Sequence, residues 1–244
     1  MKKLIALVMA LAMLLCFAAS GKNDTASDSD AHQKSFVVGY TIYKPMNYED
    51  EKGELVGYDT DLNSGTIDCI WNGFTCNSAD DDGVLRSEKV DFSYNYMENR
   101  QVVVVKKDSA IKTAADLKGK FGAAESGSAG ETYGKSFGGA SIKGFIKQAD
   151  CLTEVKSGTA DFAVLDAQLA KSYCGNGDYA NLTMVEDLSS DVEYYAIGFE
   201  KGSDLTAKVN EQLENLAKDG TIARLAEKYG VSNTAITDFS DQKK

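Results

Sequence analysis

The sequence predicts an α/β fold made of two units, and three observations support this prediction. Runs rich in β-branched residues alternate with segments whose apolar residues have helical spacing. A Ser-Gly-Thr-x-Asp phrase followed by an apolar run occurs twice, at residues 64–68 and 157–161. The chain has 244 residues, enough for two small hydrophobic cores. A duplicated phrase in a chain of this length favours two units over one.

The first twenty residues have the pattern of an export signal. Lys2 and Lys3 precede an unbroken apolar run over residues 4–15, and small residues follow it. The run is shorter than a membrane span requires. We therefore assign residues 1–20 to a signal peptide and the polar residues 21–35 to a flexible linker.

Composition excludes several classes of function. A formal net charge of −11 argues against a nucleic-acid or anionic-membrane surface. The single histidine, His32, lies in the linker, which excludes Ser-His-Asp catalysis and histidine-rich zinc sites. The acidic run at residues 80–82 lacks the spacing of a calcium loop, so we expect a solvated turn. We expect no metal and no cofactor.

The cysteines leave two alternatives open. Cys16 lies in the signal, whereas Cys69, Cys76, Cys151 and Cys174 lack the CxxC spacing of a metal site. Export permits disulfides, and buried free thiols are an equally good prediction.

The elements of the first unit follow in order along the chain. Residues 36–42 (FVVGYTI) predict a strand that ends at Lys44-Pro45, and residues 54–59 (ELVGYD) predict a short second strand. The first repeated phrase precedes another strand. Residues 90–97 follow, and the β-branched run at 100–107 is predicted to cross into the second unit.

In the second unit, Thr113 and Gly119 bound a short predicted helix, and residues 121–137 read as strand, Gly-Ser turn and helix. Leu152 and Val155 mark one face of a helix that precedes the second repeated phrase. Such a phrase ends a helix and feeds a buried strand, whose carboxyl end reaches the crevice where ligands bind.

The last third of the chain predicts one strand and two helices. Residues 193–202 (EYYAIGFEKG) predict the strand. An amphipathic helix, capped by Ser203 and ended by Gly220, has Leu205, Val209, Leu213 and Leu216 on its apolar face. A second helix ends at Gly230, and its inner face carries Ile222, Leu225, Ala226 and Tyr229.

Several phrases in combination resemble one family, the extracellular solute-binding proteins of polar amino-acid ABC transporters. The most specific are GELVGYD, VDFSYNYM, GTADFAVLD and DGTIARLAEKYG. The resemblance implies a type II periplasmic-binding-protein (Venus-flytrap) fold and an exported monomer that is not an enzyme. Its partners would be a free amino acid and the transporter's membrane permease.

The same resemblance implies how the lobes divide the chain. Lobe one would take residues 36–103, lobe two residues 104–194, and residues 195–244 would return to lobe one with the C-terminal helices. The connecting strands would cross near residues 101–105 and 194–199.

The resemblance also implies a binding site for the ligand's carboxylate. Arg86 matches the residue that grips it through two parallel hydrogen bonds. Thr75 would add a hydroxyl, and the backbone of Ser128 and Ala129 would add N–H donors at a helix start. The alternatives are a solvated surface arginine and an ordinary serine N-cap.

For the ammonium group, Asp166 matches the family's acid at the end of a lobe-two strand, with the carbonyl of Gly73 as a second acceptor. Tyr43 would pack on the ligand's side chain. The alternatives are an aspartate that caps the next helix and a core tyrosine. Thr41 and Ile42 favour neutral polar or aliphatic ligands.

This chain departs from the family in three places. Lobe one lacks a helix and a strand, about twenty to thirty residues, between GYDTDL and NSGTID. The insertion CNSADDDGVL between Thr75 and Arg86 could misplace the arginine. Ser20 stands where lipoproteins of the family have a lipid-bearing cysteine, so soluble export is favoured over lipid anchoring.

Two rival functions follow from the same residues. A few enzymes of this fold dehydrate cyclic amino-acid precursors, and Glu125 is the candidate acid for such a reaction. A vestigial sensor that binds nothing is the other, because the shortened lobe one removes part of the expected site.

Overall fold

A computed structural model of the chain describes residues 37–39, 48–56, 68–71, 73–79 and 83–243. The predicted signal peptide, the linker and the acidic run at 80–82 lie outside these ranges. So do Tyr43, Thr41, Ile42 and the junction at which a helix and a strand are expected to be missing.

The first sheet has four strands in the order β1-β4-β13-β5. β1 (Val37–Gly39) runs parallel to β4 (Asp68–Ile70), the strand that begins at the last residue of the first repeated phrase. β13 (Gly198–Phe199) is antiparallel to both β4 and β5 (Asp91–Phe92). A separate hairpin pairs β2 (Tyr48–Glu49) with β3 (Leu55–Val56), within the second predicted strand.

The second sheet has five strands in the order β11-β7-β10-β8-β9. β10, β8 and β9 run parallel to one another, while β7 is antiparallel to both of its neighbours, β10 and β11. Their bounds are β7 Gln101–Lys106, β8 Phe121–Glu125, β9 Ser141–Phe145, β10 Phe162–Asp166 and β11 Leu182–Ser189.

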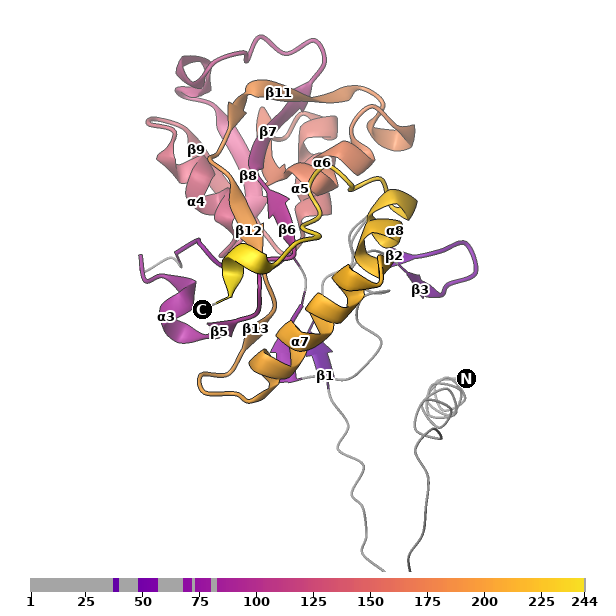
Figure 1. The fold of residues 1–244 in the computed structure, drawn as a ribbon. Coiled ribbons are helices and arrows are strands. Elements are labelled where there is room, and N and C mark those ends of the chain that lie inside the picture. The colour runs from indigo at the N-terminus through magenta and orange to yellow at the C-terminus, as the bar shows by residue number, and fades with distance from the viewer. Residues whose placement is uncertain (1–36, 40–47, 57–67, 72, 80–82, 244) are drawn as a thin grey trace, which may run out of the picture. The chain divides into compact units, whose positions relative to one another are not determined.

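Helices accompany the second sheet (Figure 1), and most agree with the sequence-based expectations. They are α4 (Ala129–Ser136), α5 (Gln148–Ser157) and α6 (Ala167–Tyr173). Thr113 forms the predicted cap, but the element it starts is a 3-10 helix, Ala114–Leu117; a second one covers Gly177–Tyr179. Leu152 and Val155 are fully buried on the predicted face of α5.

The second repeated phrase does what the sequence predicts. Gly158 ends α5 in the left-handed conformation, φ 86°, and its N–H donates to the carbonyls of Glu154 and Val155. The Asp161 carboxylate accepts a hydrogen bond from the Phe121 N–H at 2.9 Å. The chain then enters β10, all of whose residues are buried.

A two-stranded ladder separate from both sheets corrects the expected position of the first connecting strand. β6 (Met97–Asn99) pairs antiparallel with β12 (Glu193–Tyr195), and these two strands lie between the strands of the first and second sheets in the sequence. The predicted crossing at 101–105 is instead β7, because its Val-rich run is buried inside the second sheet. The lobe boundaries themselves stay a prediction.

The predicted strand at 193–202 is two strands rather than one. Between β12 and β13, the Ala196 N–H donates to the Phe74 carbonyl at 3.1 Å and the Ile197 N–H to Ser93 Oγ at 2.9 Å. The backbone changes partners at this point, since it leaves the β6 ladder and joins the first sheet.

The two C-terminal helices are α7 (Leu205–Lys218) and α8 (Thr221–Lys228). Leu213, Ile222 and Ala226 are buried in one core with residues of the first sheet. Asp204, not Ser203, is the N-cap residue of α7, although Ser203 Oγ accepts from the Leu205 N–H at 3.3 Å. The remaining short elements are α3 (Arg86–Lys89) and a 3-10 turn, Ser240–Gln242.

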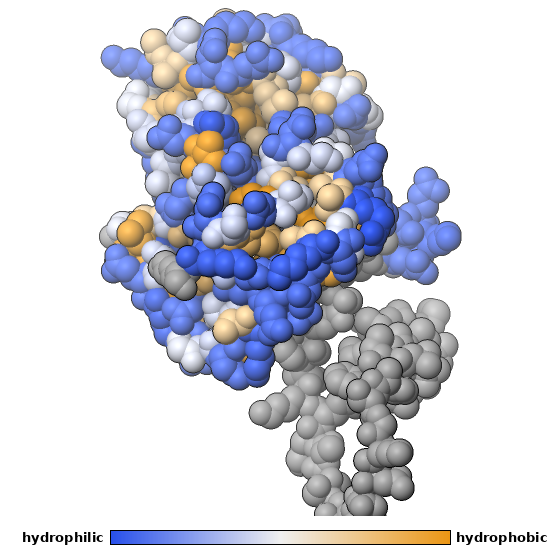
Figure 2. All heavy atoms as spheres, viewed as in Figure 1, coloured by the Kyte–Doolittle hydropathy of each residue, from blue (hydrophilic) through white to orange (hydrophobic). Residues whose placement is uncertain are grey.

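The face seen in Figure 2 is largely hydrophilic, and its apolar residues form patches separated by polar ones. Within the described ranges, every helix is too short or too polar to cross a lipid bilayer.

Candidate ligand-binding site

A cavity of about 190 Å³ lies where the loops after β4 meet the carboxyl ends of β8 and β10. This volume is below the roughly 300–1,000 Å³ typical of pockets for drug-sized ligands, so it suits a small metabolite. Six of the seven predicted site residues line it. They are Gly73, Thr75, Arg86, Ser128, Ala129 and Asp166, and the seventh, Tyr43, lies outside the described residues.

Arg86 is the first residue of α3, and its guanidinium faces the cavity. It donates to the Thr75 carbonyl at 3.2 Å and to the Gly127 carbonyl at 3.1 Å. Its Cζ lies 4.9 Å from the centre of the Phe74 ring, a cation–π contact. The arginine therefore joins a residue after β4 to the turn after β8.

The insertion before Arg86 does not remove it from the site. Ala79 and Leu85 form an isolated antiparallel bridge, and the Arg86 N–H donates to the Ser78 carbonyl at 3.0 Å. These contacts close the insertion at its base. The extra residues consequently leave Arg86 beside Thr75.

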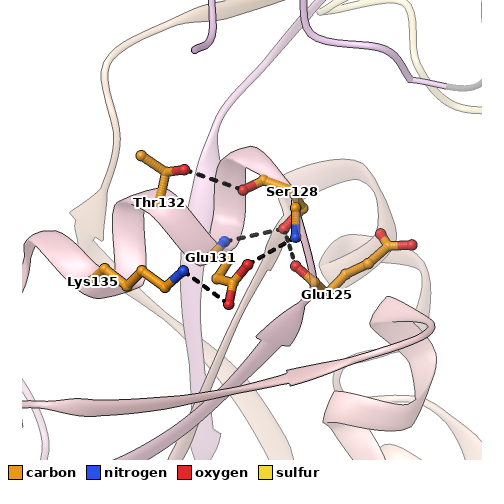
Figure 3. A network of polar contacts seen from close by, with 6 residues as sticks. Glu125, Ser128, Glu131, Thr132 and Lys135 are labelled. Atoms are coloured by element: carbon orange, nitrogen blue, oxygen red, sulfur yellow. Dashed lines mark hydrogen bonds and ion pairs between the residues drawn. The ribbon is translucent and has the colours of Figure 1, made fainter. Parts of the chain in front are cut away.

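Figure 3 shows the start of α4, where the side chains of Ser128 and Glu131 order the turn. Ser128, the N-cap residue, accepts through Oγ from the Glu131 N–H at 3.0 Å, and the Glu131 carboxylate accepts from the Gly127 N–H at 2.8 Å. Lys135 holds Glu131 from the next turn of the helix, at 3.1 Å. The Glu125 carboxylate points away from this network.

The two backbone N–H groups predicted to bind the ligand at the start of α4 differ in whether they already have an acceptor. The Ser128 N–H already donates to the Glu125 carbonyl at 3.2 Å, so the predicted donor at this position is occupied. The Ala129 N–H finds no acceptor among the described residues. Of the two predicted donors, Ala129 is the one positioned to bind an anion at the helix start.

Asp166 ends β10 and is buried, with an exposed fraction of 6%. Asn99 Nδ2 donates to its Oδ1 at 2.6 Å and Gln101 Nε2 does so at 2.7 Å. Gln148 clamps it from α5, because Nε2 donates to Oδ2 while Oε1 accepts from the Asp166 N–H at 2.9 Å. Asp166 is the N-cap residue of α6, but its side chain makes no capping hydrogen bond to that helix. The alternative of a purely capping aspartate therefore does not hold.

Sequence reasoning missed the residues that surround Asp166. Asn99 is the cross-strand partner of Glu193 in the β6–β12 ladder, and Gln101 is the partner of Asp166 in the β7–β10 ladder. Each of these two amides donates hydrogen bonds to both acids. The sequence signal that could have found them is a pair of amides, Asn99 and Gln101, just before the apolar run of residues 102–105.

Three carboxyl groups in or beside the cavity have raised pKa values. Burial raises the pKa of Asp166. Burial, and then the charge of Asp166, raise the pKa of Glu193 to about 7 and that of Glu125 to about 7. Arg86 and Lys147 are the cations that line the described part of the cavity.

The described cysteines Cys69, Cys76, Cys151 and Cys174 are free thiols, which decides between the two alternatives for these four. Within the described ranges, no group of three or more His, Cys, Asp and Glu residues could hold a metal ion.

The fold and the cavity define a class of protein. Solved structures similar to this one are two-lobed amino-acid-binding proteins, and the two-sheet α/β architecture is that of the type II periplasmic-binding-protein fold. Residues 60–232 match the bacterial extracellular solute-binding proteins, family 3, and the chain belongs to this family.

Relatives and solved structures resemble the chain over most of its length. The arginine-binding extracellular protein ArtP of Bacillus subtilis is 27% identical over 94% of this chain and 98% of its own. The arginine-, lysine-, histidine-binding protein ArtJ of Geobacillus stearothermophilus has a TM-score of 0.71 and 28% identity, covering 80% of this chain and 95% of its own. An ancestral arginine-binding protein bound to arginine has a TM-score of 0.68 and 32% identity, covering 79% and 96%.

The alignment with ArtP also bears on length. It extends over 259 positions, more than the 244 residues of this chain. Gaps in this chain are therefore needed to match its relative.

Proposed function

We propose that the cavity holds one free amino acid by its carboxylate and its ammonium group, and that the chain delivers this ligand to an ABC transporter. One observation carries the proposal: Arg86 and Asp166, which have opposite charges, line the same small cavity. A free amino acid carries the two complementary charges. Each would lose several kcal/mol of solvation on burial without such partners.

The carboxylate would bind at the Arg86 side of the cavity. The guanidinium offers a planar fork that matches a carboxylate. The Ala129 N–H and the positive end of α4 supply further stabilisation. Thr75, whose hydroxyl we predict as a further donor, is buried beside them with an exposed fraction of 2%.

The ammonium would bind at Asp166, with the carbonyl of Gly73 as a second acceptor. Gly73 has φ 54°, a left-handed conformation that glycine adopts at little cost. Because three amide side chains donate to Asp166, its carboxylate keeps a fixed position. A fixed carboxylate loses little conformational entropy on binding.

The ligand's side chain would meet Glu125 and Phe74. The ligand's carboxylate and ammonium already have partners in Arg86 and Asp166, which leaves Glu125 as a hydrogen-bond acceptor for the ligand's side chain. It therefore favours a side chain with hydrogen-bond donors. Solved relatives are bound to arginine and to glutamine, both of which carry such donors. This proposal keeps the neutral polar ligands that Thr41 and Ile42 favour, adds cationic ligands such as arginine, and disfavours aliphatic ones.

Delivery to a transporter follows from family membership. A ligand that touches both lobes binds the closed form more tightly and increases its population. The permease would recognise that form. We propose an exported monomer, in agreement with relatives whose names describe extracellular and periplasmic proteins.

Thermal unfolding of the protein with each of the twenty amino acids, ornithine and cystine tests the proposal. At a thousandfold excess over the dissociation constant, binding adds roughly 4 kcal/mol of stability, a shift of several degrees. We expect a shift with one or a few amino acids. Cooperative melting with no shift for any of them would contradict the proposal and support a vestigial protein.

A second candidate is an enzyme, favoured by the position of Glu125. Its pKa of about 7 suits a general acid, and it lines the cavity with Asp166. A relative with 30% identity is an ancestral amino-acid-binding protein described as a precursor of cyclohexadienyl dehydratase. Conversion of a cyclohexadienyl amino acid into an aromatic one, followed by ultraviolet absorbance, tests it; turnover lost in Glu125→Gln would support the enzyme.

A further inference from the structure

We infer that Glu193 is a second carboxyl group of the ammonium site, sharing one proton with Asp166 until an amino acid binds and its ammonium displaces that proton into solvent. This inference rests on the proposed function, because it assigns the ammonium to Asp166. It makes Glu193, on the strand that connects the two sheets, a positioning residue for the ligand.

The geometry starts from two neighbouring ladders. Asn99 and Gln101 point to the same side, and their cross-strand partners are Glu193 and Asp166. Asn99 Nδ2 lies 2.6 Å from Asp166 Oδ1 and 2.6 Å from Glu193 Oε1. The two carboxyl oxygens are therefore no more than about 5 Å apart. At that separation inside a protein, like charges repel strongly.

The two acids of this quartet share the same two amide donors. Each side-chain amide has two N–H groups, and both Asn99 and Gln101 give one to each acid. Asn99 Oδ1 is buried without a hydrogen-bond partner. A buried cluster with spare acceptors gains from one additional proton or from an ammonium group.

The nearby cation does not outweigh the burial of the pair. The charge of Arg86 favours ionised Glu193, but it acts on the pKa of this acid more weakly than burial and the charge of Asp166 do. Burial and repulsion both favour a shared proton, in line with the raised pKa values of both acids. The titratable and charged groups that face the pair or share its cavity are Glu125, Arg86, Lys147, Tyr195 and Cys76.

The proton balance is simple. In its protonated form, which prevails below about pH 7, the unliganded pair carries one proton and one negative charge. An arriving ammonium supplies both hydrogen-bond donors and a positive charge, so the proton leaves to the buffer. The pair then carries two negative charges, partly offset by the ligand. Binding should consequently weaken as the pH falls, because protons compete with the ligand for the same acids.

Titration calorimetry with arginine, or with whichever amino acid shifts the melting curve, tests the inference. Repeating it in buffers of different ionisation enthalpy counts the protons released. Because Glu125 also titrates near pH 7, the informative comparison is Glu125→Gln against Glu125→Gln with Glu193→Gln. Glutamine keeps the acceptor oxygen that Asn99 and Gln101 use, which makes Glu193→Gln a conservative change.

At pH 7 we expect Glu125→Gln to release about half a proton per ligand bound, because half of the Glu193 population is protonated near its pKa of about 7. The double variant should release none. From pH 8.5 to 5.5, the dissociation constant of Glu125→Gln should rise by up to about 30-fold, and that of the double variant much less.

Two results would overturn the inference. One is ligand binding by Glu125→Gln with no proton release at any pH. The other is equal release by the double variant. If the double variant does not fold, infrared difference spectra of Glu125→Gln with and without ligand test the inference instead. The inference requires that the band of a protonated carboxyl group disappears on ligand binding, and a band that persists would overturn it. An absence of binding heat for all amino acids would instead contradict the proposed function.

Discussion

The Arg86 guanidinium donates to the Gly127 carbonyl at 3.1 Å across the cavity, which links the start of α3 to the turn before α4. Gly127 has φ 72°, and its own N–H is held by Glu131 at 2.8 Å, so the carbonyl is fixed in direction. A ligand carboxylate beside this contact would reach both the guanidinium and the N–H groups at the start of α4. This relationship makes Arg86 the first residue to test.

Arg86→Ala should lower ligand affinity by about 30- to 1,000-fold, because truncating one partner of a desolvated charge pair costs about 2–4 kcal/mol. Arg86→Lys should recover only part, since an ammonium cannot form the bidentate pair. Calorimetry measures both. The matched control is Arg224→Ala, on the exposed side of α8, where the arginine contacts Thr221. Equal losses in both alanine variants would contradict a specific role for Arg86.

Asp166→Asn should abolish amino-acid binding while leaving a folded protein. The substitution removes the charge that attracts the ammonium, yet an asparagine oxygen can still accept from Asn99 and Gln101. Circular dichroism and calorimetry on the same sample separate the two effects. Asp161→Asn, at the beginning of the same strand, is the control and should keep its affinity. Binding of the amino acid by Asp166→Asn with wild-type affinity would refute the assignment.

Glu125 should make stability depend on pH. Its pKa is raised from 4.5 to about 7 in the folded protein, chiefly by burial. The folded state therefore holds the proton more tightly, so the contribution of Glu125 to stability is greatest below pH 4.5 and is lost as the pH rises through 7. Glu125→Gln should remove this fall, about 1 kcal/mol after allowing for solvent screening. Urea unfolding at pH 4.5 and 8 measures it, with exposed Glu186→Gln as the control; an unchanged pH dependence in Glu125→Gln would exclude this cause.

The thiols should react slowly in the native protein. Burial raises the pKa of Cys76 and Cys174 to about 11 and that of Cys151 to about 12. Since only the thiolate reacts, alkylation at pH 7.5 should be at least about 100-fold slower than for an ordinary exposed cysteine. All three should react rapidly in urea without reductant, as mass spectrometry would detect. A cysteine that reacts only after reduction would reveal a disulfide.

The end of β10 was predictable from sequence because its signals are local. A glycine that ends a helix, a short apolar strand and a terminal acid place Asp166 at the carboxyl edge of the sheet. The Arg86 position required the family resemblance. The effect of the insertion before it depended on a bridge between Ala79 and Leu85, which the residue pattern does not encode.

The quartet around Asp166 was not predictable in the same way. It depends on the register of two antiparallel ladders, since a shift of one residue would turn Asn99 and Gln101 to the opposite face. The misplaced crossing has a related cause. A β-branched run suits a buried core strand as well as a connection, and only its neighbours, β10 and β11, decide between them.

The most direct test of the account compares the bound amino acid with two analogues of it, the decarboxylated amine and the N-acetylated acid. For arginine as the ligand, calorimetry should show that each analogue binds at least about 100-fold more weakly, because one leaves Arg86 without its carboxylate and the other leaves Asp166 without its ammonium. If either analogue binds as tightly as the amino acid, recognition does not depend on both charged groups, and the assigned roles of Arg86 and Asp166 are wrong.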